Sequence, residues 1–202
     1  MSKAPVNKQR RYLLGAIASI ASAISGGNAV ARVMFRNPEP EPVNKEPVEV
    51  DISKLESGQL LNVRWQDKPV WILRRTEKNT VDLSTLNNML TDPDSTVDKQ
   101  PDYAKNPLRS IRPDIAVLLG ICTHLGCSPN YRPDIAPEDI GSYWKGGFLC
   151  PCHGSRYDLA GRVFMGSPAQ ENLQVPPHHF LSDTLILIGE SEQRQSKRAA
   201  ES

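Results

Sequence analysis

Two short segments of this 202-residue chain hold the side chains best suited to bind a metal. One reads Cys122-Thr-His-Leu-Gly-Cys127, and the other reads Cys150-Pro-Cys-His-Gly-Ser155. Together they contain all four cysteines and two of the four histidines of the chain. Thiols and imidazoles grouped so tightly indicate a metal site, a disulfide, or both.

Each segment pairs one cysteine with one histidine, as Cys122-x-His124 and Cys150-x-x-His153. Two cysteines and two histidines suit a 2Fe–2S cluster in which the cysteines bind one iron and the histidines bind the other. Each segment also holds one further cysteine, at an equivalent place in its loop. We therefore predict a disulfide between these two residues, Cys127 and Cys152, which an exported domain would permit.

Zinc is the main alternative for this set of ligands, because two cysteines and two histidines also form structural zinc sites. Such sites usually place cysteine near cysteine and histidine near histidine, whereas both segments here mix the two types. A cluster held by four cysteines would leave both segment histidines without a role. His178 and His179 lie outside the segments, and we interpret them as surface or packing side chains.

The amino terminus has the pattern of a membrane anchor. Residues 1–31 contain no acidic side chain, and a basic stretch at 1–11 precedes an uncharged run of 20 residues at 12–31. That run is about long enough to cross a bilayer as a helix, so we predict a transmembrane helix within 12–36. The basic flank places the amino terminus in the cytoplasm. Arg10-Arg11 before Tyr-Leu-Leu also resembles a twin-arginine export signal, and we favour a retained anchor over a cleaved signal peptide.

The rest of the chain divides into a hinge, a head and a tail. Residues 37–48 carry four prolines and predict an extended hinge. Residues 49–190 predict a mainly β head, a small antiparallel β-sandwich with one short helix. Residues 191–202 are polar and are expected to be disordered. The hydrophobic fraction of 39% suits a real core, and the net charge of +1 gives no electrostatic reason to expect nucleic-acid binding.

Hydrophobic patterns place the elements of the head. Alternation at 61–65, a turn at 66–68 and a return at 69–73 predict a hairpin. Apolar runs at 115–119 and 147–149 predict strands that lead into the two cysteine segments, and 184–188 predicts a final strand. Three leucines at helical spacing predict the helix, within 79–90, with Asp-Pro-Asp at 92–94 ending it.

The two cysteine segments together resemble those of the Rieske iron–sulfur subunit of ubiquinol–cytochrome c reductase, in its proteobacterial form. The resemblance extends over nearly the whole chain, through the anchor, the hinge, the head and the stretch at 161–176. It implies one 2Fe–2S cluster, with Cys122 and Cys150 on the inner iron and His124 and His153 on the outer iron. It also implies the disulfide between the other two cysteines.

Four further residues match positions with roles in that family. Ser155 and Tyr157 match hydroxyl residues that donate hydrogen bonds to a bridging sulfur and to a ligand thiolate. Leu125 matches the residue that shields the cluster at the docking tip, and Pro168 lies in the loop that covers the cluster. The family often has Gly-x-Pro-Ala-Pro in that loop, whereas this chain has Gln170 at the last position.

The resemblance also implies a function. The head would accept an electron and a proton from ubiquinol, with His124 and His153 at the catalytic tip, and would pass the electron to a c-type cytochrome subunit, contributing to proton translocation. The implied partners are that subunit and a cytochrome b subunit, in a dimeric bc1 complex of the bacterial inner membrane with the head in the periplasm. Alternatives are the Rieske subunit of another exported oxidoreductase such as arsenite oxidase, a soluble ferredoxin or dioxygenase component, and a zinc-stabilised binding module.

Overall fold

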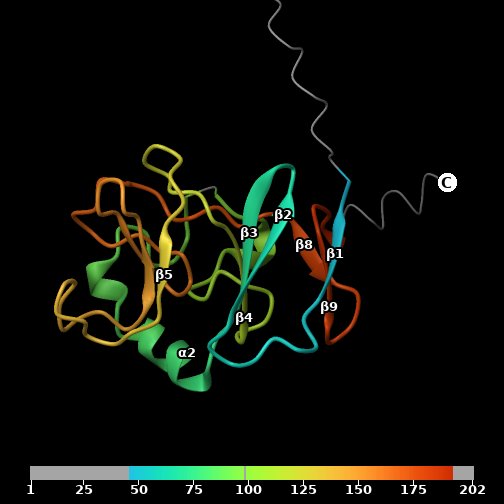
Figure 1. Ribbon diagram of the computed structural model, residues 1–202, viewed down its shortest axis with the longest axis horizontal. Coiled ribbons are helices and arrows are strands. Elements are labelled where there is room, and N and C mark those ends of the chain that lie inside the picture. Colours follow the sequence, from blue (N-terminus) through green and yellow to red (C-terminus); the bar gives the residue numbers. More distant parts are fainter. Residues whose placement is uncertain (1–45, 98, 193–202) are drawn as a thin grey trace, which may run out of the picture. The chain divides into compact units, whose positions relative to one another are not determined.

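The computed structural model describes residues 46–97 and 99–192 (Figure 1). These residues form three antiparallel sheets of three strands each, together with one α-helix and two short 3-10 helices. The strands are β1 (Val48–Asp51), β2 (Leu60–Trp65), β3 (Lys68–Arg74), β4 (Ile115–Leu119), β5 (Asn130–Arg132), β6 (Gly147–Leu149), β7 (Arg156–Asp158), β8 (His178–Phe180) and β9 (Leu185–Ile188).

The predicted membrane helix, all but the last residues of the predicted hinge, and nearly all of the predicted tail lie outside the described residues. In the part of the chain that the structure describes, no helix combines the length and the apolar character needed to cross a bilayer.

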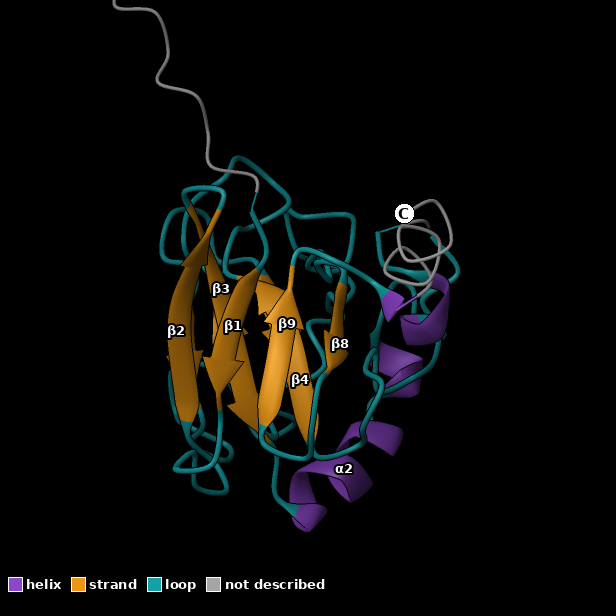
Figure 2. Cartoon of the chain, turned by 90° about the vertical axis from the view of Figure 1, so that its right-hand side faces the viewer, coloured by secondary structure: helices purple, strands orange, loops and turns teal. Residues whose placement is uncertain are grey.

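Two of the sheets form the predicted antiparallel sandwich. The sheet β1-β9-β8 lies beside the sheet β2-β3-β4 (Figure 2), and apolar residues from both share one buried core. Val70 and Ile72 of β3 belong to this core, whereas Trp71 and Leu73 belong to a second core on the other face of the same strand. Strands β3 and β4 are therefore buried on both faces, which explains why 115–119 is apolar without interruption.

The third sheet, β5-β6-β7, packs on that second core and carries the second cysteine segment between β6 and β7. The ring of Trp71 stacks on Phe148 of β6, with centroids 4.8 Å apart. The free cysteines Cys122 and Cys150 are part of the same core. Strand β4 ends just before the first cysteine segment, and β6 ends just before the second. The sheets β2-β3-β4 and β5-β6-β7 therefore carry the two segments at the same end of the head.

The hairpin prediction is confirmed, because β2 and β3 pair through a tight turn in which Gln66 and Asp67 have positive φ. The prediction of one helix up to Leu90 is wrong in its extent. Helix α2 (Glu77–Ser84) begins at a capping box on Thr76 and stops at Ser84, and a separate 3-10 turn covers Asn87–Met89.

The reason for this early end is tertiary. The buried guanidinium of Arg162 donates to the Leu83 carbonyl at 2.7 Å, the group that a longer helix would pair with the amide of Asn87. Arg162 also donates to the Asn87 side chain at 3.0 Å. The three predicted leucines are nevertheless all buried.

Candidate metal centre

The two cysteine segments form loops with the same backbone hydrogen bonds. In the first, the Cys122 amide donates to the Cys127 carbonyl at 2.8 Å, and the Gly126 amide donates to the Cys122 carbonyl at 3.0 Å. In the second, Cys150 pairs with Ser155 at 2.8 Å and Gly154 pairs with Cys150 at 2.9 Å. Each glycine has a positive φ, +82° and +75°, which closes the loop in a conformation that other residues rarely adopt.

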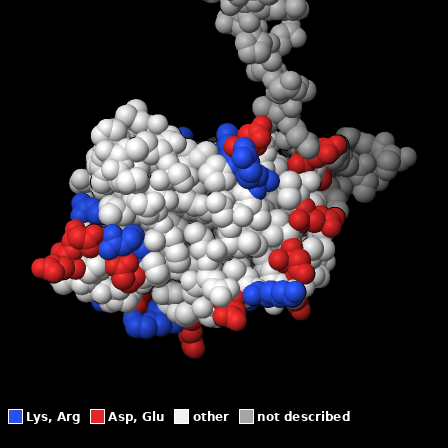
Figure 3. Space-filling model, in the orientation of Figure 1, with Lys and Arg blue, Asp and Glu red and all other residues white. Residues whose placement is uncertain are grey.

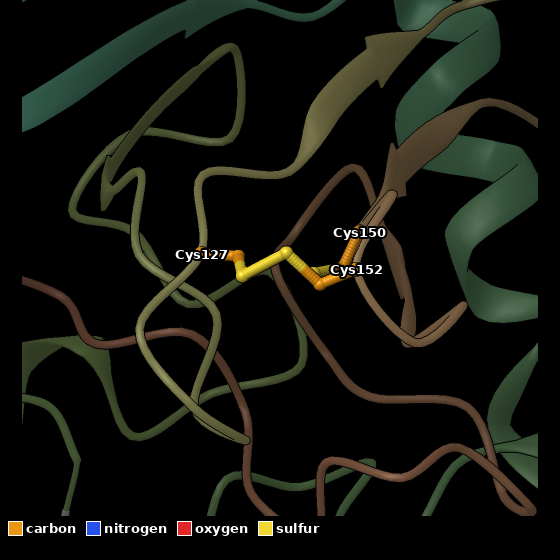
Figure 4. Close-up of side chains that lie close together, drawn as sticks. All are labelled: Cys127, Cys150 and Cys152. Carbon is orange, nitrogen blue, oxygen red and sulfur yellow. A yellow bond between two sulfur atoms is a disulfide. The ribbon is translucent and has the colours of Figure 1, made fainter.

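This shared pattern corrects one prediction. Cys127 corresponds to Ser155 in the hydrogen bonding, and Cys152 corresponds to His124, so the two outer cysteines do not occupy equivalent places. They are nevertheless joined by a disulfide, with an S–S distance of 2.04 Å and Cα atoms 6.6 Å apart (Figure 4). The predicted pairing is therefore confirmed, and it results from the way the two loops face each other.

The two remaining cysteines are free and buried. The sulfur of Cys150 lies within 4.8 Å of both disulfide sulfurs (Figure 4), but only Cys122 and Cys150 can offer a thiolate. Burial alone would raise the pKa of the Cys122 thiol, but hydrogen bonds, the largest from Tyr157, outweigh it and lower that pKa. Burial raises the pKa of the Cys150 thiol, and its neighbour Cys122 adds to the rise. Two adjacent buried thiolates need a cation as partner, so the pair fits a metal ion.

The two histidines lie nearer the surface than the cysteines. The rings of His124 and His153 meet edge to face, with centroids 4.9 Å apart and planes at 88°. His124 is half-buried and His153 is exposed, and the neighbouring Leu125 is 69% exposed. The loops thus bring the two predicted imidazole ligands together near the surface, and the two predicted thiol ligands are both buried in the core. This arrangement, with buried thiols and imidazoles near the surface, fits a cluster with one cysteine-bound iron and one histidine-bound iron.

Both predicted hydroxyl donors are buried beside the free cysteines. The Tyr157 hydroxyl oxygen lies 3.2 Å from the Cys122 sulfur, and burial, followed by Cys122, raises the pKa of this phenol. The Ser155 hydroxyl oxygen accepts the Ala169 amide at 3.1 Å. Its proton therefore remains available for a second partner, and Ser155 also contributes to the lowered pKa of Cys122.

Sequence reasoning missed one side chain at this site. Thr123 lies between two predicted ligands, and its hydroxyl oxygen is 3.1 Å from the Tyr157 hydroxyl oxygen. Its amide donates to the same Tyr157 oxygen at 3.2 Å, and its hydroxyl donates to the Glu171 carbonyl at 2.7 Å. The only sequence signal was its place between Cys122 and His124.

The segment around Pro168 is tied to the second loop. Besides the bond from Ala169, the Ser167 hydroxyl oxygen accepts the Arg156 amide at 3.2 Å. Pro168 itself is exposed between these two attachments. Gln170, at the position where the family often has proline, donates from its side chain to the Ser167 carbonyl at 3.2 Å. This bond joins the residues on either side of Pro168 and Ala169.

The loops at this end of the head carry no formal charge. Residues 120–130, 146–155 and 163–170 contain no lysine, arginine, aspartate or glutamate. In the view of Figure 3, the upper left, where the yellow and orange loops of Figure 1 lie, is correspondingly free of charged side chains. Charged residues gather elsewhere, for example in the pairing of Arg132 with Asp134 and Asp139. An uncharged tip suits contact with an apolar partner surface.

Comparison with known proteins agrees with this geometry. The sequence pattern of the Rieske [2Fe-2S] domain matches residues 46–177. The chain is 54% identical, over 192 residues, to the ubiquinol-cytochrome c reductase iron-sulfur subunit of Allochromatium vinosum, covering 94% of this chain and 93% of that one. It is 41% identical over 182 residues to the subunit of the same name from Bradyrhizobium diazoefficiens, covering 89% and 94%.

The fold and the site define a Rieske-type iron–sulfur protein, with a 2Fe–2S cluster as its cofactor. More specifically, the chain belongs to the family of iron–sulfur subunits of ubiquinol–cytochrome c reductase. This membership favours the bc1-type subunit over the alternative of an arsenite oxidase subunit.

Proposed function

We propose that this chain is the iron–sulfur subunit of a cytochrome bc1 complex that accepts an electron and a proton from ubiquinol and passes the electron to a c-type cytochrome. The observation that carries the proposal is the presence, on two uncharged loops, of two buried free thiols and of two imidazoles in contact nearer the surface. The names of the relatives, which include ubiquinol and cytochrome c, support the same substrates.

Each of the four ligands has a proposed role. Cys122 and Cys150 hold the inner iron, where burial keeps water away from the thiolates. His124 and His153 hold the outer iron and form the catalytic tip. The bound cluster supplies a one-electron carrier. The ring nitrogen of each histidine that does not face the metal is the place where a quinol hydroxyl can bind and leave its proton.

The surrounding residues prepare this tip. Ser155 and Tyr157 donate hydrogen bonds toward sulfur and so favour the reduced state. Leu125 and Pro168 cover the cluster, and the exposed Leu125 supplies apolar contact when the head docks on its partner. The disulfide between Cys127 and Cys152 holds the two loops together.

The proposed setting is the bacterial inner membrane. Residues 12–36 anchor the chain with the amino terminus in the cytoplasm, and residues 37–48 form the hinge to a periplasmic head. The disulfide supports this placement, because such bonds persist in oxidising compartments and are rare in the cytosol. The proposed partners are the cytochrome b and c-type cytochrome subunits of a dimeric complex.

Purification from membranes through a tag on this chain tests the proposal. We expect haem b and haem c to copurify, and the preparation to reduce cytochrome c with ubiquinol as donor. Copurification with a molybdenum subunit, without quinol oxidation, would show that the partner assignment is wrong.

Metal analysis of the purified chain tests the centre separately. We expect two irons and two acid-labile sulfides per chain, and a low-temperature spin-resonance signal after reduction. Stoichiometric zinc without a reduced-state signal would contradict the cluster assignment at these four ligands.

A further inference from the structure

Two polar groups from distant parts of the chain meet at the hydroxyl of Thr123. Its oxygen lies 3.1 Å from the Tyr157 hydroxyl oxygen and 2.7 Å from the Glu171 carbonyl oxygen. Tyr157 in turn lies 3.2 Å from the Cys122 sulfur. Glu171 directly follows the cover segment, residues 166–170 around Pro168, so Thr123 stands between that segment and the hydrogen bond to sulfur.

Counting protons shows how these groups compete. A carbonyl oxygen can only accept, and so can the Cys122 sulfur in its proposed role as an iron-bound thiolate. The distance of 2.7 Å indicates that the Thr123 hydroxyl donates its proton to the backbone carbonyl of Glu171. The Tyr157 proton is then left with two acceptors at similar distances, the sulfur at 3.2 Å and the Thr123 oxygen at 3.1 Å. A proton shared between two acceptors binds each of them less strongly than one directed at a single acceptor.

We infer that Thr123 is a positioning residue that sets the strength of the hydrogen bond from Tyr157 to the Cys122 sulfur, and that its bond to Glu171 couples the cover segment to the reduction potential. While the Thr123 hydroxyl donates its hydrogen bond to the Glu171 backbone carbonyl, the Thr123 oxygen acts as an acceptor and draws the Tyr157 proton away from sulfur. If Glu171 moves away, the Thr123 hydroxyl can donate to Tyr157, which then donates to sulfur alone. The inference rests on the proposed role of Cys122 as a ligand.

Replacing Thr123 by valine in the full-length chain tests the inference. Valine has the same shape without the oxygen, and it keeps the backbone amide that holds Tyr157 in place at 3.2 Å. We expect Thr123→Val to favour the reduced cluster by about threefold, which is about 28 mV for a one-electron couple. Redox titration followed by spin resonance measures this shift without relying on turnover. Thr123→Ser, which keeps the hydroxyl, is the matched control and should retain the wild-type potential.

A double-mutant cycle separates this mechanism from mere loosening of the cover segment. In a Tyr157→Phe background, Thr123→Val should leave the potential unchanged, because no phenol proton remains to be redirected. A shift of the same size in both backgrounds, or a lowered or unchanged potential in Thr123→Val alone, would overturn the inference. Thr123→Ala also lacks the oxygen and serves as a second variant, with the same expected direction, if the valine variant does not assemble its cluster.

The same variants also distinguish a wrong inference about Thr123 from a wrong proposed function. If Tyr157→Phe alone leaves the potential unchanged, the ligand role of Cys122 beside Tyr157 is wrong. If Tyr157→Phe lowers the potential but the cycle shows no coupling, only the role of Thr123 is wrong.

Discussion

The Tyr157 hydroxyl oxygen lies 3.2 Å from the Cys122 sulfur, although the two residues are 35 positions apart in the chain. Strand β7, which follows the second loop, thus delivers a hydrogen-bond donor to a cysteine of the first loop. Because the phenol is fully buried, no water competes for this bond. If Cys122 is a cluster ligand, as proposed, this contact should make the reduction potential sensitive to one hydroxyl group.

Removing the hydroxyl donors should lower the reduction potential while leaving the cluster in place. In the proposed centre, Tyr157→Phe and Ser155→Ala would each delete a hydrogen bond to charged sulfur, worth about 1.5–3 kcal/mol. For a one-electron couple this is a fall of at most about 60–130 mV, measured by redox titration. Tyr131→Phe is a matched control, because Tyr131 packs against the same core but donates to the Gly58 carbonyl. A fall of equal size in this control would show a general packing effect.

Deleting the disulfide should make the cluster labile. The bond between Cys127 and Cys152 closes a separation of 25 residues, for which the entropic stabilisation is about 3.5 kcal/mol. In a Cys127→Ala/Cys152→Ala variant, the two loops can separate, and we expect faster loss of the cluster absorbance on warming. Thiol counting without reductant should find only two thiols in the wild-type chain after the cluster is removed. Four free thiols in fully active protein would contradict the structural role of the bond.

The stability of the head should fall in acid partly through His178. Burial lowers the pKa of this histidine to about 4, whereas in the unfolded chain it is about 6.5. Between these values the unfolded chain binds more protons, so stability is complete above about pH 6.5 and is lost as the pH falls toward 4. The contribution reaches about 3 kcal/mol at its upper limit.

The variant His178→Asn checks this pH dependence. An asparagine amide can replace the ring nitrogen that lies 2.9 Å from the Pro176 carbonyl, and it does not titrate. Denaturant midpoints of the purified chain, measured at pH 7.5 and at pH 4.5, should differ less in the variant than in wild type. An identical pH dependence in both proteins would assign the acid sensitivity to other groups.

The hinge should limit turnover without changing the cluster. If residues 37–48 let the head move between a quinol site and a cytochrome, stiffening them with two or three added prolines should slow steady-state quinol oxidation. The cluster spectrum and potential should stay the same, because these residues lie before the head. A same-length insertion of glycine and serine is the control. Normal turnover in a variant whose head is shown to be immobile would contradict a moving head.

The sequence by itself determined the chemistry of the centre and much of the sandwich. Four cysteines and two histidines in two short segments left few sets of ligands, because metal preferences depend on residue type and local spacing. Alternation over 61–65 predicted β2, since a strand of six residues is long enough to show a period of two, and the uninterrupted apolar run at 115–119 predicted β4.

Only the tertiary structure decided how these pieces meet. In the third sheet only β6 was predicted, from the run at 147–149, whereas β5 and β7, with three residues each, are too short to show a period. The end of helix α2 depends on Arg162, which is 79 positions from the carbonyl that it binds. The contacts of Thr123 with Tyr157 and Glu171 span 34 and 48 positions. Such contacts depend on how separate loops pack against one another, which local spacing and residue type do not specify.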